Sequence, residues 1–149
     1  MQFRLRSRLI EFTETDDEGK TIVVGSLTCR QFTLAEDQIR AQMEEDAQTL
    51  NMTEILAKNG QGLSVEEASR QNFREHIYPQ LFACAHGENI PDEETAFGMP
   101  GSELYKWYDA AYYTCPEWFK IVDEFIEAKR KSVKALLDLQ KKKEAKLPE

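Results

Sequence analysis

The sequence predicts an α+β protein that is mainly α, with an N-terminal β-hairpin followed by four or more helices. Residues 2–30 alternate polar and apolar side chains in two segments that a Gly-containing turn separates. In the rest of the chain, four segments typical of helix N-caps each precede a run with apolar residues at helical spacing. Twelve of the fifteen aromatic residues lie between Phe73 and Phe125, so the core or a contact surface is concentrated there.

Length, charge and cysteine content narrow the class further. A chain of 149 residues has the size of one domain, and we expect a single domain over 1–149 with a hairpin (1–32), a helical body (33–140) and a fraying basic tail (141–149). The net charge of -8 argues against a nucleic-acid partner. No apolar run is long enough to span a bilayer, so we expect no membrane partner. Three cysteines without a CxxC pair favour the reducing cytoplasm.

The hairpin occupies the first part of the chain. Residues 2–13 alternate apolar residues with arginines and a glutamate, as expected of a strand with one solvated face. Residues 15–20 form a polar turn around Gly19, and residues 21–29 are rich in β-branched side chains. Together these segments predict two antiparallel strands.

Capping signals divide the remaining chain into helices. The four expected N-cap residues are Thr33, Ser64, Ser102 and Thr114. We expect helices to start near Leu34, Val65, Glu103 and Pro116. Pro79 lies inside the second helical segment, which predicts a kink or break near Tyr78, and Gly87 should close that segment. Residues 88–101 contain two prolines and two glycines and are expected to be irregular.

Catalytic and metal-binding patterns are sparse. Cys84 and His86 are two positions apart, whereas His76 and Cys115 stand alone, and zinc usually needs four ligands in two close pairs. We therefore expect no metal, no disulfide, no cofactor and no enzymatic activity. The alternative is a small metal- or thiol-dependent protein that uses Cys84, His86 and Cys115.

The aromatic residues near position 110 predict a contact surface. Five Tyr or Trp residues lie within nine positions and cannot all point the same way on one helix. We assign the face with Leu104, Trp107, Tyr108 and Ala111 to the core. The expected protein interface, with a copy of the chain or with another protein, comprises Tyr105, Tyr112, Tyr113 and Trp118. Alternatively, the segment with Phe73 or the loop with Phe97 covers these side chains.

The order of these features provides a further clue. A hairpin leads through SLTCRQFT (26–33) into an acidic helix, followed by RQNFR (70–74), YPQLFAC (78–84) and CPEWF (115–119). Over residues 21–119 this order resembles a tail assembly chaperone of long-tailed bacteriophages. The resemblance implies a small, acidic, helical protein without catalytic residues, acting in the host cytoplasm. It also implies binding to the elongated, helical tape measure protein, which the chaperone keeps soluble while the tail tube polymerises around it. A self-associating structural or regulatory phage protein is the other possibility.

Overall fold

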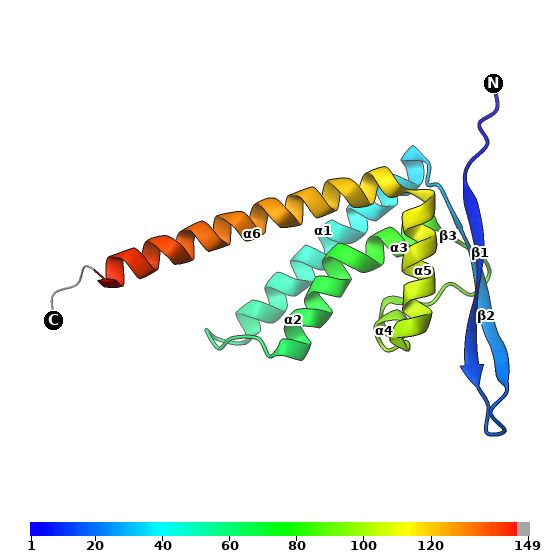
Figure 1. Cartoon of the computed structure of the whole chain (residues 1–149), viewed down its shortest axis with the longest axis horizontal. Helices are drawn as coiled ribbons and strands as arrows, with labels where there is room; N and C mark the ends of the chain where they lie inside the picture. Colours follow the sequence, from blue (N-terminus) through cyan, green and yellow to red (C-terminus); the bar gives the residue numbers. More distant parts are fainter. Residues whose placement is uncertain (146–149) are drawn as a thin grey trace. The chain divides into compact units, whose positions relative to one another are not determined.

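The computed structural model describes the backbone of residues 1–145, and their side chains except at residues 118, 120–123, 125, 126 and 129. The chain divides into two compact units, Met1–Cys115 and Pro116–Glu149. The first unit contains a three-stranded sheet and several helices, and the second is built on one long helix (Figure 1). This arrangement confirms the predicted α+β, mainly α class. The single domain expected over residues 1–149 stays a prediction.

The N-terminal hairpin consists of β1 (Ser7–Thr15) and β2 (Thr21–Arg30). Ile10 and Phe12 point into the core, opposite Leu27 and Gly25 of β2. Asp16 organises the turn, because its carboxylate accepts the backbone N–H groups of residues 18 and 20 at 3.0 and 2.8 Å.

The first strand is shorter than the sequence pattern indicates. Residues 2–6 alternate as a strand should, but β1 begins only at Ser7, whose partner is Arg30. The chain turns toward the first helix just after Arg30, so β2 offers no residues with which residues 2–5 could pair.

A β-bulge leaves Val24 of β2 as an extra residue opposite the step from Phe12 to Thr13, and Thr13 faces α5 (Gly101–Thr114). The backbone N–H and the hydroxyl of Thr13 both donate to the carboxylate of Glu103, at 3.1 and 2.9 Å. Lys106 lies 2.7 Å from the same carboxylate. The hydrogen bond from Lys106, with those from Thr13, lowers the pKa of Glu103. The start of α5 is therefore fixed to the hairpin where the strand is irregular.

Capping boxes open the next two helices as predicted. Before α1 (Leu34–Ala57), the hydroxyl of Thr33 accepts the N–H of Glu36, whose carboxylate accepts the N–H of Thr33. Ser64 and Glu67 make the same exchange before α2 (Val65–Asn72). Each reciprocal pair satisfies backbone donors that a helix start leaves without partners.

Pro79 interrupts the helix near Tyr78, as expected. After α2 the backbone widens into a π-helical turn, η1 (Phe73–Ile77), and then continues as α3 (Tyr78–Cys84). The N–H of Tyr78 reaches back five residues to the carbonyl of Phe73. Widening of this kind makes room for a proline ring that would clash with the preceding turn of an α-helix.

The segment after α3 differs from the sequence prediction in two places. The helix ends at Cys84 rather than at Gly87, because β3 (Ala85–His86) pairs with Cys29 and Thr28 of β2. Residues 88–101 were expected to be irregular but contain α4 (Glu93–Phe97), whose N-cap Asp92 accepts the N–H of Thr95 at 2.8 Å.

Two expected caps are not used as predicted. The N-cap of α5 is Pro100, and Ser102 lies inside the helix, because the Pro100 carbonyl accepts the N–H groups of residues 103 and 104. Thr114 is the last residue of α5, and its hydroxyl donates to the carbonyls of Ala110 and Ala111. It therefore finishes one helix rather than opening the next.

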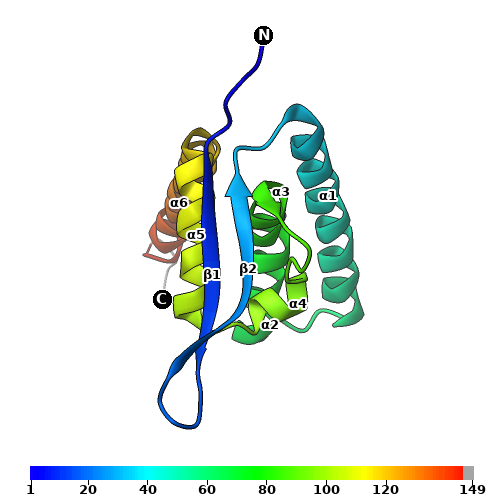
Figure 2. The same cartoon turned by 90° about the vertical axis from the view of Figure 1, so that its right-hand side faces the viewer.

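Trp107 occupies the centre of the core of the first unit. Its side chain is fully buried, its indole N–H donates to the carbonyl of Leu81 at 3.1 Å, and its ring meets Phe12 and Tyr78 edge-on. Helices α3 and α5 lie on one side of the sheet (Figure 2). Among the described elements of this unit, none covers the opposite face of the sheet.

The second unit contains α6 (Pro116–Ala145), which starts at the predicted residue. Residues 141–145 of the expected fraying tail belong to this helix. Its last turn carries Lys142 and Lys143, whose charges complement the negative end of the helix dipole. Several apolar side chains of α6 are exposed: Val133, Leu136, Leu137 and Leu139.

Candidate protein-binding surface

The outer face of α5 carries an aromatic stripe formed by Tyr105, Tyr108 and Tyr112. Residues spaced by three and four positions lie one above another on a helix, so these three rings follow one line along α5. Tyr105 is 67% exposed and Tyr112 is 44% exposed, while Tyr108 is half-buried. The rings of Tyr105 and Tyr108 are 6.3 Å apart. The stripe therefore presents aromatic area along more than one helical turn.

The opposite face of α5 faces the core, as predicted. Trp107 and Ala111 are buried there, with Ala110 beside them. Tyr108 was assigned to this face but lies at its border, and Leu104 is also half-buried. The expected separation of core and surface aromatics on this helix is thus present, with Tyr108 between the two groups.

Tyr113 and Trp118 differ from the stripe. The guanidinium of Arg8 lies 3.9 Å from the centre of the Tyr113 ring, a cation–π contact with β1. Tyr113 is still 48% exposed. It therefore joins the hairpin to α5 while remaining half in contact with water. Trp118 belongs to α6, and its side chain lies outside the described residues.

The cysteines considered for chemistry are buried. Cys29, Cys84 and Cys115 are free thiols inside the first unit. The hydrogen bond with Cys29, together with burial, raises the pKa of the Cys84 thiol, so it is protonated at neutral pH. His86 points elsewhere, with Nε2 2.9 Å from a carboxylate oxygen of Glu36. Within the part of the chain that the structure describes, no three Cys, His, Asp or Glu side chains are grouped as metal ligands.

A second surface feature is a groove of about 620 Å³ beside β2. One side is formed by β2 from Val24 to Thr28 together with β1 from Phe12 to Glu14, and the other by the loop from His86 through Pro91 with part of α4 and Met99. The groove is not predictable from the sequence, because its second side depends on β3 and α4.

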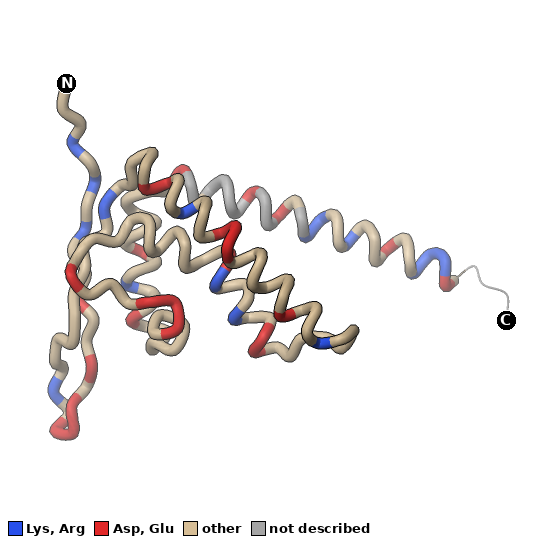
Figure 3. The backbone as a smooth tube through the Cα atoms, turned by 180° about the vertical axis from the view of Figure 1, so that it is seen from behind, with Lys and Arg blue, Asp and Glu red and all other residues tan. Residues whose placement is uncertain are grey.

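Charge is distributed unevenly along the hairpin. Arginines lie toward the N-terminal end at positions 4, 6 and 8, whereas the turn carries Asp16, Asp17 and Glu18 (Figure 3). The two ends of the hairpin are therefore of opposite charge. The charged residues that line the groove are Glu14, Glu88 and Glu103, together with His86.

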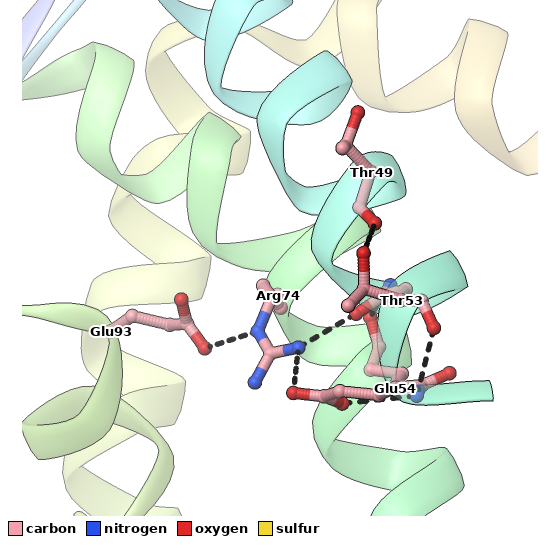
Figure 4. A network of polar contacts seen from close by, with 7 residues as sticks. Thr49, Thr53, Glu54, Arg74 and Glu93 are labelled. Atoms are coloured by element: carbon pink, nitrogen blue, oxygen red, sulfur yellow. Dashed lines mark hydrogen bonds and ion pairs between the residues drawn. The ribbon is translucent and has the colours of Figure 1, made fainter. Parts of the chain in front are cut away.

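Arg74 holds α4, and with it one wall of the groove, in place (Figure 4). Its guanidinium bonds to Glu93 of α4 at 3.1 Å and to Glu54 and Asn51 of α1 at 2.9 and 2.8 Å. Asn51 also donates to the carbonyl of Gln71 at 3.0 Å. The role of Arg74 is not predictable from the sequence, because an arginine in a helical segment normally indicates a solvated face.

Comparisons with known proteins give no family assignment. No model of a protein family matches the chain, and no match was found among curated proteins or among solved structures. In the described part of the chain, no helix is both long and apolar enough to cross a membrane.

Proposed function

We propose that the protein is a non-enzymatic binding module that holds a helical partner against α5, as a phage tail assembly chaperone holds its tape measure protein. The observation that carries the proposal is the stripe of Tyr105, Tyr108 and Tyr112. An amphipathic helix docks through side chains at three- and four-residue spacing, and such a stripe matches that spacing. Tyrosine is also a residue type that protein interfaces favour.

The charge of the chain supports the same class of partner. A net charge of -8 favours a protein with basic residues and disfavours nucleic acid. The order of elements over residues 21–119, from the hairpin to the start of α6, is the order on which the resemblance to the phage chaperones rests. In that role the protein would act in the cytoplasm of the host cell, and its client would be the tape measure protein.

Co-expression tests this proposal. The candidate client is a long helical protein encoded next to this chain, and we expect it to stay soluble only when this chain is present. The double variant Tyr105→Ala with Tyr112→Ala should lose that protection. Ile39→Ala removes a comparably exposed apolar side chain from α1 and should retain it. Equal client solubility with the double variant and the wild type would overturn the proposal.

A further inference from the structure

The strand β2 has an open edge on the side away from β1. β3 pairs with β2 only at Thr28 and Cys29, and Gly87, with φ of 152°, then turns the chain aside next to Leu27. On this side, among the described residues of the first unit, no strand lies beside Thr21 to Gly25. The backbone groups on this edge are therefore available to another strand.

One bulge is the sole protection against pairing within this edge. Proteins discourage strand addition with charged residues, prolines or bulges at an edge. Apart from the bulge at Val24, the sequence TIVVG (21–25) has none of these, and its Ile and Val side chains are 44–57% exposed. By contrast, the free edge of β1 carries Arg8, Glu11 and Glu14. The open edge of β2 thus has the composition of a strand that accepts a partner.

The groove adjoins this edge at Val24 and Gly25, and its charges select for a basic segment. Glu14 and Glu88 line it and make no ion pair within the described residues. The acidic turn residues Asp16, Asp17 and Glu18 follow directly at the end of the strand. An extended segment with apolar residues at every second position and a basic residue between them would match both the edge and these charges.

Residues 1–5 of the chain form such a segment. Phe3 is 81% exposed, Leu5 is half-buried, and Arg4 between them has no ion-pair partner among the described residues. This arm extends from the end of the sheet opposite the turn (Figure 1). Its apolar and polar residues alternate as in a β-strand, but among the described residues no strand pairs with it.

The arm cannot fill the open edge of its own chain. Ser7 pairs with Arg30 and Phe12 with Gly25, so five strand residues, about 17 Å, separate the root of the arm from Gly25. Residues 1–6 span about 20 Å when fully extended. Reaching Gly25 would use nearly the whole arm and leave no residues to pair with Thr21 to Val24.

We propose that residues 1–5 of one copy add as a strand to the open edge of β2, Thr21 to Gly25, in a second copy. In this arrangement Arg4 faces the groove that Glu14 and Glu88 line, while Phe3 and Leu5 lie on the opposite face of the added strand. Each copy contributes an arm at one end and an edge at the other, so the contact is head-to-tail. This surface is separate from the tyrosine stripe of α5, and the inference goes beyond the client binding proposed above.

Complementary variants test the head-to-tail contact. Phe3→Ser with Arg4→Glu disables the arm, and Val23→Lys disables the edge; both sites are exposed, so the fold should persist, as circular dichroism can check. We expect the wild type to associate with rising concentration by light scattering. For each variant alone, the dissociation constant of self-association should rise about tenfold or more, so that the variant is monomeric at concentrations where the wild type associates. An equimolar mixture should form a 1:1 dimer, because each variant retains the half that the other lacks.

Three results would overturn the proposal: a wild type that is monomeric at every concentration, variants that associate like the wild type, or a mixture that forms no dimer. Cysteine pairing gives an independent measurement. Phe3→Cys in one copy and Val24→Cys in another should form a disulfide under mild oxidation, since the native thiols are buried. The control Leu50→Cys should not react with Phe3→Cys, and equal reaction with both would contradict the assigned contact. Tyr105→Ala should leave self-association unchanged, which separates this test from that of client binding.

Discussion

On the inner face of α5, Trp107 is fully buried, bonded to the Leu81 carbonyl and packed against Phe12. On the outer face of the same helix, Tyr105 is 67% exposed beside Tyr108. Both faces carry aromatic rings, yet one holds the first unit together and the other leaves apolar area in contact with water. Aromatic content alone therefore does not separate core from interface; the position around the helix does.

The largest expected effect is on the inner face. Trp107→Ala should lower the free energy of unfolding by about 3–5 kcal/mol, because it leaves a cavity and removes the partner of the Leu81 carbonyl. Chemical denaturation of the variant and the wild type measures this difference. A loss below about 1 kcal/mol would mean that Trp107 is not the centre of the core.

The start of α5 gives a prediction on pH. The folded-state pKa of Glu103 lies below its ordinary value of 4.5, so its carboxylate stabilises the fold above that pH. This stabilisation is lost as the pH falls through the lower, folded-state pKa. Glu103→Gln should therefore destabilise the protein at pH 7 and flatten the decline of stability under acid. Glu94→Gln, on an exposed carboxylate of α4, should leave the acid profile unchanged, and identical profiles for the two variants would refute the role of Glu103.

Tyr113 lies between the two faces and should show an intermediate effect. Its contact with Arg8 is expected to contribute about 0.5–1 kcal/mol to stability. A double-mutant cycle with Arg8→Ala and Tyr113→Ala isolates this coupling. A coupling free energy of zero between Arg8 and Tyr113 would mean that Tyr113 belongs with Tyr105 among the side chains of the outer face.

The smallest expected effect on stability belongs to the outer face. Tyr105→Ala should change the free energy of unfolding by no more than about 0.5 kcal/mol, because its ring is mostly in water. Thermal or chemical unfolding provides the measurement. A loss as large as that of Trp107→Ala would remove the distinction between the two faces.

Local chemistry made much of the fold predictable. The starts of α1 and α2 follow from capping boxes that need only Thr33 with Glu36 and Ser64 with Glu67. The interruption at Pro79 follows from the missing N–H of proline. The separation of Tyr105 from Trp107 follows from helical geometry. Each of these features is decided by residues a few positions apart.

Features that depend on distant partners were not predictable. β3 is two residues long and exists because β2 lies beside it. Residues 2–6 carry a strand pattern but lack a partner strand. Arg74 is the buried centre of a polar network only because α1 and α4 place Glu54 and Glu93 beside its guanidinium. The groove beside β2 depends on these same long-range contacts, so no local pattern of residues predicts it.

Titration of an amphipathic helical segment of the client against this protein tests the central claim most directly. The wild type should bind it, and Tyr105→Ala with Tyr112→Ala should lose about 2 kcal/mol of binding free energy or more, with the fold retained. Ile39→Ala should bind like the wild type. Unchanged affinity in the folded double variant would contradict the assignment of the α5 stripe as the binding surface.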